Sequence, residues 1–291
     1  MKKINIFCFG FGQVAKNFIK KLNTKNIKFN LTATSRENTS KKVFDGIEYD
    51  CIQFSEDSFD KKLIKNLESS NYILISIAPI NGEDIVAKNF QNIFERNKFK
   101  WFTYLSATSV YGDHKGEWVD EKSKTNPTSS TGSQRLKAEK LWMELAKNKN
   151  LPIQIFRLSG IYSHESNVLK RLKSGDAKII KKQNQFFSRI HVEDIAEVLF
   201  KSLEKFKAKE IYNISDDRPT SSEELILYGS ELLNIEPPAI IEFKSINSEI
   251  VKNFYKDSKK VNNKKMKDIF NFKLKFPTYV EGLNDIHNNI I

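Results

Sequence analysis

The sequence predicts an α/β protein with a doubly wound parallel sheet and a smaller C-terminal region. Short apolar runs alternate with amphipathic helix patterns up to residue 159. Strands that are apolar throughout are typical of a parallel sheet covered by helices on both faces. A glycine-rich turn also joins the first apolar run to the first helix pattern. Together these observations favour an α/β fold over an all-helical or all-strand one.

The first region is expected to contribute the buried strands. They are the apolar runs at 4–9, 29–35, 49–54, 72–78, 101–107 and 153–159. Helices are predicted between them because apolar residues recur three and four positions apart. These helices are expected at 14–22, 61–67, 85–96 and 137–146.

The alternation ends after Tyr162, and the remaining elements are less regular. A helix over 220–233 is predicted from its Ser/Thr-x-x-Glu capping box. The other expected elements are a short strand followed by a helix in 189–206, a strand at 210–215, and helices at 260–270 and 278–286.

Two regions follow from this pattern. We expect a dinucleotide-binding domain over 1–165, to which 189–216 returns, and a smaller substrate-binding region over 166–291. Neither region contains an internal repeat or a low-complexity linker.

The composition argues against two classes of partner. The net charge of +12 is compatible with nucleic-acid binding. However, the lysines are spread along the chain on the polar sides of helices, and no basic stripe alternates with aromatic residues. No apolar run approaches the roughly 18 residues of a membrane span. We therefore expect neither nucleic acid nor a membrane as a partner.

Cysteine and histidine usage points to a cytoplasmic protein without a metal site. Cys8 and Cys51 lie in apolar, strand-like segments, which predicts buried and reduced thiols. The four histidines lack metal-ligand spacing. The apolar run near the N-terminus is short, ends in Gly-x-Gly and lacks a small-residue cleavage site, unlike a signal peptide.

The turn FGFGQVA has the pattern G-x-G-x-x-A between the first strand and the first helix. Gly10 permits a tight turn, Gly12 lets the backbone approach a pyrophosphate, and Ala15 keeps the helix close to the sheet. This pattern is typical of Rossmann-type nucleotide binding. We expect Gly10, Gly12, Gln13, Val14 and Ala15 to bind a dinucleotide; a structural turn in another α/β protein is the alternative.

The end of the second strand distinguishes two cofactors. An NAD site needs a carboxylate about 20 residues after the glycines, to accept the ribose 2′-hydroxyl. The chain offers Thr34, Ser35 and Arg36 there, and a hydroxyl beside a guanidinium suits a 2′-phosphate. We therefore expect Ser35 and Arg36 to favour NADP over NAD; in the alternative, Arg36 is a solvated turn residue.

The segment after the fourth strand is expected at the carboxyl edge of the sheet. There Ile77, Ala78 and Pro79 are candidates for contact with the ribose or nicotinamide side of the cofactor. An ordinary strand-to-helix turn is the alternative.

Five further segments occur in an order that resembles one known family. They are LSATSVYGD (105–113), TGSQRLKAE (131–139), FRLSGIY (156–162), RIHVEDIA (189–196) and YNISDDRP (212–219). Together they resemble the extended short-chain dehydrogenase/reductase family, the NAD(P)-dependent epimerase/dehydratases that act on nucleotide sugars. The match covers nearly the whole chain. Because the family's usual glycine pattern is G-x-x-G-x-x-G, the turn here is similar to an atypical branch.

The resemblance implies a catalytic Ser/Thr, Tyr and Lys, and all three are replaced. Their positions fall on Ala107, Thr131 and Arg135. An aliphatic hydroxyl ionises far above a phenol, so Thr131 is a poor acid or base near neutral pH. Arg135 donates hydrogen bonds, including to a cofactor ribose, but does not shuttle protons. The family's usual mechanism is therefore not available as written.

Other residues near the expected site are candidates for the missing roles. Thr131, Arg135, Tyr111 and Thr108 are the candidate catalytic residues, and Tyr111 and Arg189 are candidates for substrate contact. In the alternative, Tyr111 is a wall residue of the VYG turn. His191 is expected to be buried and structural.

Two functions from different classes follow. The first is an NADP-dependent oxidoreductase or epimerase-like enzyme that acts on a sugar nucleotide or another hydroxylated small molecule with non-standard acid–base residues. The second is a catalytically silent NADP-binding protein that serves as a sensor or binds a partner. The resemblance also implies a homodimer, paired through helices such as 85–96 and 133–147.

Overall fold

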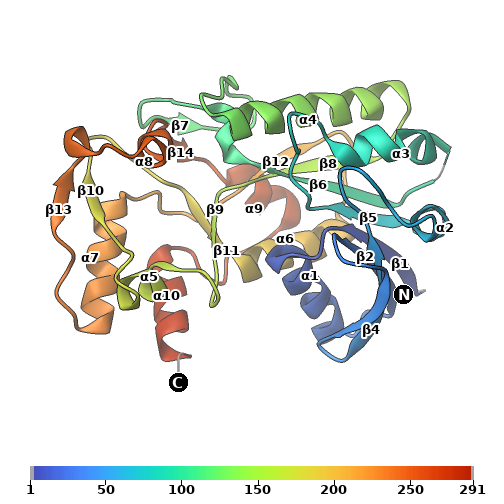
Figure 1. Ribbon diagram of the computed structural model, residues 1–291, viewed down its shortest axis with the longest axis horizontal. Coiled ribbons are helices and arrows are strands. Elements are labelled where there is room, and N and C mark those ends of the chain that lie inside the picture. The colour runs from blue at the N-terminus through green and yellow to red at the C-terminus, as the bar shows by residue number, and fades with distance from the viewer. Residues whose placement is uncertain (1–2, 97, 290–291) are drawn as a thin grey trace. The chain divides into compact units, whose positions relative to one another are not determined.

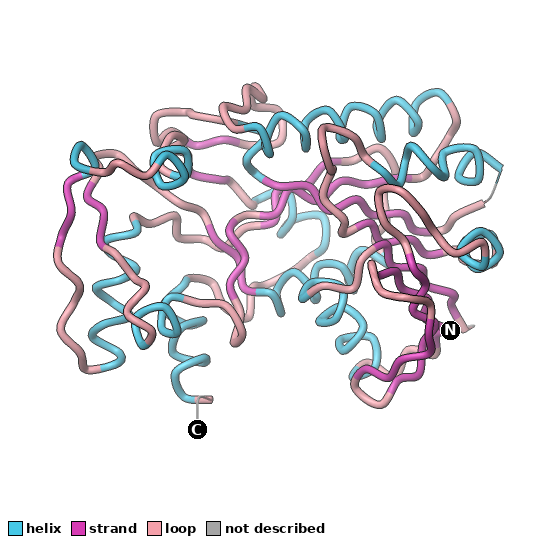
Figure 2. Tube along the Cα trace, in the orientation of Figure 1, coloured by secondary structure: helices cyan, strands magenta, loops and turns pink. Residues whose placement is uncertain are grey.

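The computed structural model describes residues 3–96 and 98–289, and the chain divides into two compact units. The first unit comprises Met1–Ser106, Gln134–Arg157 and Ile195–Tyr212. The second unit comprises Ala107–Ser133, Leu158–Asp194 and Asn213–Ile291. Figure 1 labels the elements and Figure 2 colours them by type.

The two units differ from the sequence-based domain ranges at 107–133, 158–165, 189–194 and 213–216. The sequence places these segments with the first region, whereas the structure groups them with the second unit. The two units follow the packing of the segments rather than their order along the chain. The functions expected of the two regions stay predictions.

The first unit is built on an eight-stranded sheet of order β12-β8-β6-β5-β1-β2-β4-β3. Its strands are β1 (Ile4–Phe9), β2 (Phe29–Ser35), β3 (Ser40–Phe44), β4 (Ile47–Gln53), β5 (Tyr72–Ile75), β6 (Trp101–Ala107), β8 (Ile153–Leu158) and β12 (Ile211–Ile214). The pairs β1–β2, β1–β5, β2–β4 and β5–β6 are parallel. The strand expected at 72–78 ends at Ile75.

Helices cover both faces of this sheet. Successive side chains of β6 point to opposite faces and therefore contact different helices. They are α1 (Gln13–Thr24), α2 (Lys62–Glu68), α3 (Ile85–Arg96), α4 (Ser130–Asn148) and α6 (Val192–Glu204). On one face, Trp101 stacks on Phe18 of α1 and donates to Ser202 Oγ of α6 at 2.9 Å. On the other face, Phe102 contacts Trp142 of α4. The predicted α/β fold class is confirmed.

The sheet is mixed rather than purely parallel, because β3 is an antiparallel edge strand. Phe44 pairs with Ile47, so β3 and β4 form a hairpin with the two-residue loop Asp45-Gly46. Both loop residues have positive φ, 52° and 74°, as the tight Asp-Gly hairpin turn requires. Strand β3 was not predicted from the sequence, although an Asp-Gly pair between possible strands is a known hairpin signal.

The second unit has its own apolar core. Around it pack α5 (Val168–Lys173), α7 (Ser222–Leu233) and α10 (Tyr279–Asn288). Ser221 caps α7 by accepting from the Glu224 amide at 3.0 Å, as the capping box predicts. The unit's short parallel pairs are β9 (Gly160–Tyr162) with β11 (Arg189–His191), β10 (Ile179–Lys181) with β13 (Ile240–Glu242), and β7 (Trp118–Val119) with β14 (Lys260–Val261).

The remaining elements of the second unit are also short. They are the 3₁₀ turns η1 (Thr108–Tyr111) and η2 (Phe243–Ser245), and the helices α8 (Glu249–Phe254) and α9 (Lys264–Phe270). The two 3₁₀ turns and α8 were not predicted, because three to six residues are too few to show a hydrophobic period.

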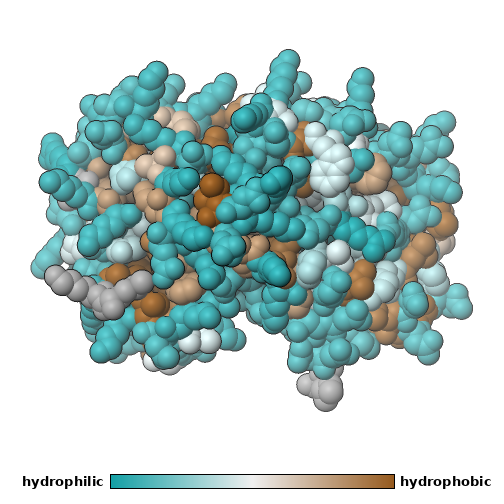
Figure 3. Space-filling model, turned by 180° about the vertical axis from the view of Figure 1, so that it is seen from behind, coloured by the Kyte–Doolittle hydropathy of each residue, from teal (hydrophilic) through white to brown (hydrophobic). Residues whose placement is uncertain are grey.

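The face of the molecule drawn in Figure 3 is largely polar. Hydrophilic side chains dominate the face in Figure 3, and apolar ones form only scattered patches. Among the helices of the described residues, none combines the length and the apolar character that crossing a membrane requires. Both cysteines are buried and free of disulfides, as expected.

Candidate functional site

The turn between β1 and α1 is held by side chains from two neighbouring strands. Gly10 has φ +83°, and a Cβ there would lie 2.8 Å from Ser76 Oγ. The Gly10 amide donates to Thr34 Oγ1 at 2.9 Å, at the end of β2. The Ser76 hydroxyl, just after β5, donates to the Phe9 carbonyl at 2.9 Å. Only a glycine fits at position 10 without strain.

The start of α1 fits the phosphates of a dinucleotide. A Cβ added to Gly12 would meet no heavy atom within 4 Å, so space is open in front of this residue. No side chain caps the first turn, and no acidic residue lies in it. The amides of Gln13, Val14 and Ala15 therefore keep the positive end of the helix dipole available to an anion.

The end of β2 presents an exposed arginine, Arg36. Ser35 Oγ accepts from the Glu37 amide at 3.2 Å, and the Glu37 carboxylate forms an ion pair with Lys42. Arg36 is exposed and makes no hydrogen bond or ion pair with any described residue. The Glu37 carboxylate at this edge is therefore already paired, whereas the Arg36 guanidinium is exposed.

The segment after β5 lies next to the glycine turn. A Cβ on Gly10 would lie 3.1 Å from Ile77 Cγ1. Ala78 is exposed, while Ile77 and Pro79 are half-buried. Their contact with a cofactor stays a prediction.

Arg135 is anchored within the first unit. Its Nη1 donates to the Leu105 carbonyl at 2.7 Å and to the Tyr104 hydroxyl at 3.1 Å, and the guanidinium lies over the Tyr104 ring. One turn along α4, buried Glu139 pairs with Arg157 at 2.7 Å. These contacts fix the direction of the Arg135 side chain at the end of β6.

A cavity of about 730 Å³ lies within the second unit. Much of its wall carries hydroxyl groups, from Thr108, Ser109, Ser129, Thr131, Ser159, Ser166, Ser188 and Ser222. Cations also line it, namely Arg171, Arg189 and Lys259. This size and chemistry suit a hydroxylated, negatively charged small molecule.

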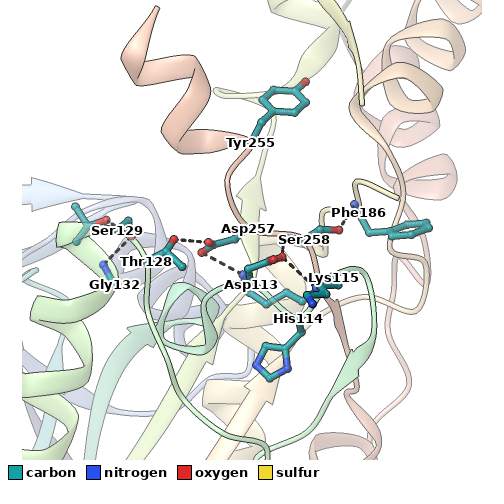
Figure 4. A network of polar contacts seen from close by, with 12 residues as sticks. Asp113, His114, Lys115, Thr128, Ser129, Gly132, Phe186, Tyr255, Asp257 and Ser258 are labelled. Atoms are coloured by element: carbon teal, nitrogen blue, oxygen red, sulfur yellow. Dashed lines mark hydrogen bonds and ion pairs between the residues drawn. The ribbon is translucent and has the colours of Figure 1, made fainter. Parts of the chain in front are cut away.

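Thr131 and Thr108 contribute to one part of this wall. The Thr131 hydroxyl lies 3.3 Å from Ser129 Oγ, and both residues belong to the segment that begins α4. Ser129 Oγ accepts from the Gly132 amide at 3.1 Å (Figure 4). A Cβ on Gly132 would lie 2.7 Å from the Ser109 carbonyl, so η1 packs tightly against this helix start.

Arg189 brings a charge without an ion-pair partner to the cavity. Its Nη1 donates to the Phe187 and Thr220 carbonyls, at 3.0 and 3.3 Å. Asp216 acts electrostatically on Arg189, but burial raises the pKa of this carboxyl. No salt bridge joins Arg189 to a carboxylate among the described residues. The guanidinium therefore remains available to an anionic ligand.

Within the described ranges, no group of three or more His, Cys, Asp or Glu is arranged to hold a metal ion. The candidate sites are thus the glycine turn of the first unit and the cavity of the second.

A family model described as "NAD dependent epimerase/dehydratase family" matches residues 85–215. The chain belongs to this family. No curated protein matches the sequence.

Solved structures agree over nearly the full length. A functionally unknown conserved protein from Silicibacter pomeroyi is 31% identical, with 98% of each chain covered and a TM-score of 0.87. The dTDP-glucose 4,6-dehydratase of Bacillus anthracis, in complex with NAD, is 17% identical, with 98% of this chain and 96% of that chain covered and a TM-score of 0.77. The UDP-glucuronic acid 4-epimerase of Bacillus cereus, in complex with UDP-glucuronic acid and NAD, is 16% identical, with 98% of each chain covered and a TM-score of 0.78.

The three positions that the resemblance assigns to catalytic residues lie in different units of the structure. Ala107 and Thr131 line the cavity of the second unit, whereas Arg135 lies in the first unit with its own partners. That these positions correspond to the family's Ser/Thr, Tyr and Lys stays a prediction from sequence.

Tyr111 does not lie where a catalytic or substrate-binding residue would be expected. Its side chain is fully buried, its hydroxyl donates to Asn213 Oδ1 at 2.7 Å, and it does not line the cavity. A phenol that is bonded inside the protein has no path to a substrate. The structure thus favours the wall-residue alternative over a catalytic or substrate-binding Tyr111.

His191 is buried, as expected. Its ring packs edge-on against Tyr162 and Phe276, and its Nδ1 lies 3.3 Å from the Glu193 amide. Burial lowers the pKa of His191 to about 4, so the ring is neutral near pH 7.

Several site residues were not predicted from the sequence. Ser76 bonds the glycine turn, and Arg171, Ser159 and Lys259 line the cavity. Thr34 was noted only at the end of the second strand, whereas its hydroxyl accepts from the Gly10 amide. Arg171 and Lys259 occur in lysine-rich, polar stretches that look like solvated surface. Only Ser159 carried a signal, because it follows the last buried strand in a segment resembling the family.

Proposed function

We propose that this epimerase/dehydratase family member binds NADP and acts on a sugar nucleotide, or a similarly hydroxylated small molecule, with non-standard acid–base residues. The observation that carries this proposal is the cavity of the second unit, which is lined by hydroxyl groups and by Arg189, a residue without a salt bridge to any described carboxylate. Hydroxyls match a sugar, and a guanidinium matches a phosphate or carboxylate.

The glycine turn supports the cofactor part of the proposal. The amides at the start of α1 would hold the pyrophosphate, and Arg36 would hold the 2′-phosphate. When bound, a nicotinamide dinucleotide supplies hydride transfer. The chain's own residues bind and orient the substrate and move its protons.

A second candidate is a catalytically silent NADP-binding protein. Ala107, Thr131 and Arg135 favour it, since none of them performs the acid–base step that the resemblance implies. Both candidates share the cofactor site, so turnover separates them. The expected homodimer and cytoplasmic location stay predictions.

The cofactor part is tested by titrating the protein with NADPH and NADH and following nicotinamide fluorescence. We expect NADPH to bind more tightly, and Arg36→Ala to weaken NADPH binding by about tenfold or more, because a charged hydrogen-bonded pair is lost. NADH affinity is expected to stay unchanged. Lys41→Ala, which removes a nearby exposed cation paired with Glu48, is the matched control. If neither cofactor binds below millimolar concentration, both candidate functions fail.

The substrate part uses UDP-glucuronic acid as the probe. Calorimetry is expected to show binding that Arg189→Met weakens about tenfold or more, whereas Arg218→Met, which removes an exposed arginine paired with Glu224, leaves it unchanged. Chromatography of the nucleotide sugar after incubation with NADP⁺ then separates the candidates. Conversion supports the enzyme, and NADPH binding without conversion of UDP-glucuronic acid, UDP-glucose or UDP-N-acetylglucosamine supports the silent protein.

A further inference from the structure

The missing acid–base chemistry raises the question of which cavity residue can exchange a proton. The titratable side chains on the wall are Tyr162, Arg171, Arg189, Asp257, Lys259 and Tyr279. Burial raises the pKa of both tyrosines, to about 12 for Tyr279, so their phenols stay protonated near neutral pH. A guanidinium does not give up its proton in proteins. These four side chains are therefore poor proton carriers, which leaves Asp257 and Lys259.

Lys259 is unusual among the lysines of this chain. Its side chain is only 12% exposed, yet it lines the cavity. Burial lowers its pKa, because an ammonium is poorly solvated there. Asp257 and Asp113 oppose this effect, but the direction of the change remains downward. A lysine shifted toward neutrality is a group that enzymes use for proton transfer.

Asp257 holds Lys259 in place. The Asp257 carboxylate lies 3.8 Å from Lys259 Nζ and is only 14% exposed. The Thr128 hydroxyl donates to the same carboxylate, and Gln185 Nε2 donates to the Asp257 carbonyl at 2.6 Å. The pair is therefore fixed at both its side chain and its backbone.

The second carboxylate near Lys259 is fixed in the same way. Asp113 Oδ1 accepts from the amides of Ser258 and Lys115, at 2.9 and 3.0 Å (Figure 4). Lys182, which follows β10, also acts on Asp113. Two carboxylates, Asp257 and Asp113, thus act on Lys259, and Lys182 acts on one of them.

We propose that Lys259, positioned by the Thr128–Asp257 pair, is the catalytic residue that exchanges a proton with a substrate hydroxyl in this cavity. The inference rests on the proposed function, because it assigns the acid–base role for which Thr131 and Arg135 are unsuited. It places that role outside α4, on the segment before β14.

The step is a proton transfer. The O–H bond of the substrate hydroxyl breaks, its electron pair stays on the oxygen, and a new N–H bond forms at Lys259 Nζ, which becomes an ammonium. The reverse transfer returns the proton to the oxygen. Oxidation of the carbinol carbon additionally needs a hydride acceptor, which is the oxidised nicotinamide dinucleotide of the proposed function.

The first test measures the titration of Lys259 without any substrate. The full chain is acetylated briefly with acetic anhydride across a pH series, and mass spectrometry follows each lysine separately. Lys259 is expected to become reactive at lower pH than Lys260, its neighbour. Asp257→Asn should move the Lys259 profile to still lower pH, because it removes the carboxylate that favours the ammonium. A profile like that of Lys260, or one unmoved by Asp257→Asn, overturns the proposal.

The second test measures conversion of UDP-glucuronic acid with NADP⁺. Lys259→Met is expected to lower turnover about a hundredfold or more, the usual effect of losing a general acid–base group. NADPH affinity should stay within about twofold, and Lys260→Met serves as the matched control. Lys259→Met with full turnover overturns the proposal. Turnover in Lys259→Arg equal to that of the native protein also overturns it, because arginine keeps the charge but does not carry the proton.

The two tests separate this inference from the proposed function. If the native protein converts none of the nucleotide sugars, the enzyme proposal fails on these probes, and the acetylation profile alone decides whether Lys259 is shifted as required. If the native protein converts a probe while Lys259 titrates like Lys260, the enzyme proposal stands and the role of Lys259 fails.

Discussion

Thr131 presents an aliphatic hydroxyl to the cavity, 3.3 Å from Ser129 Oγ, where the resemblance implies a phenol. Arg135, one turn later, donates to the Leu105 carbonyl and the Tyr104 hydroxyl. Both side chains can position a ligand or a strand end, but neither exchanges protons near neutral pH. The chemistry available at these two residues is binding.

Restoring the family's residues at both positions tests this view. We expect Thr131→Tyr with Arg135→Lys to convert UDP-glucuronic acid no more than about twofold faster than the native protein, because Ala107 still offers no hydroxyl to the reacting oxygen. Chromatography measures the conversion. Thr131→Phe with Arg135→Lys is the matched control, since it adds the ring without the phenol. A rate about tenfold above that of the native protein, seen with Thr131→Tyr but not with Thr131→Phe, would contradict this view. It would mean that the site still supports the family's usual chemistry once the phenol is restored.

The turn between β1 and α1 contains two glycines whose surroundings differ. Gly10 lies at φ +83° against Ser76, whereas Gly12 has φ −81° and open space where its Cβ would be. The two glycines therefore differ in what their backbone requires. The fold requires a glycine at position 10, whereas at position 12 we predict that the glycine serves the approach of a ligand.

Two alanine variants test this division. Gly12→Ala is expected to leave the free energy of unfolding within about 0.5 kcal/mol of the native value, while NADPH affinity falls about tenfold, because the methyl group occupies the space of the pyrophosphate. Gly10→Ala is expected to lose about 1–2 kcal/mol of stability, because its φ is strained for a residue with a Cβ. Urea denaturation and fluorescence titration measure both effects. Equal NADPH binding by Gly12→Ala and the native protein would argue against a phosphate site.

At the level of elements, the sequence predicted long, periodic segments and missed short ones. The helix at 85–96 matches α3, because apolar residues recur at helical spacing. The pair β9–β11 has only three residues in each strand, too few for any period. Such strands form because neighbouring segments pack beside them, which the local sequence does not encode.

For the molecule as a whole, stability should depend on pH through His191. Its folded pKa of about 4 lies below its ordinary value of 6.5, because the neutral ring is buried. The stabilisation is therefore fully present above pH 6.5 and is lost as the pH falls toward 4. Over this window the loss amounts to roughly 2–3 kcal/mol.

The variant His191→Phe tests this dependence. It keeps a buried ring beside Tyr162 and Phe276 but removes the titration. We expect the fall in the free energy of unfolding between pH 7.5 and pH 4.5 to be smaller in the variant by roughly 2 kcal/mol. Urea denaturation at the two pH values measures it, with His287→Asn as the control. An unchanged fall would mean that another group causes the acid sensitivity.

The sequence by itself determined the α/β class, the glycine turn and the family. Each of these depends on residues close together in the chain, such as Gly10 and Gly12, or on periodic apolar patterns. Local sterics and hydrophobic periodicity are enough to specify them.

Only the tertiary structure decided which residues share the cavity. Thr131, Arg189 and Lys259 come from segments more than 50 residues apart, and no local pattern links them. Burial also sets Tyr111 and Lys259 apart from what the sequence suggests: it encloses the Tyr111 phenol and lowers the pKa of Lys259, an amine that looks like solvated surface in the sequence. Solvation depends on the whole packed chain, so it becomes known only when the chain is folded.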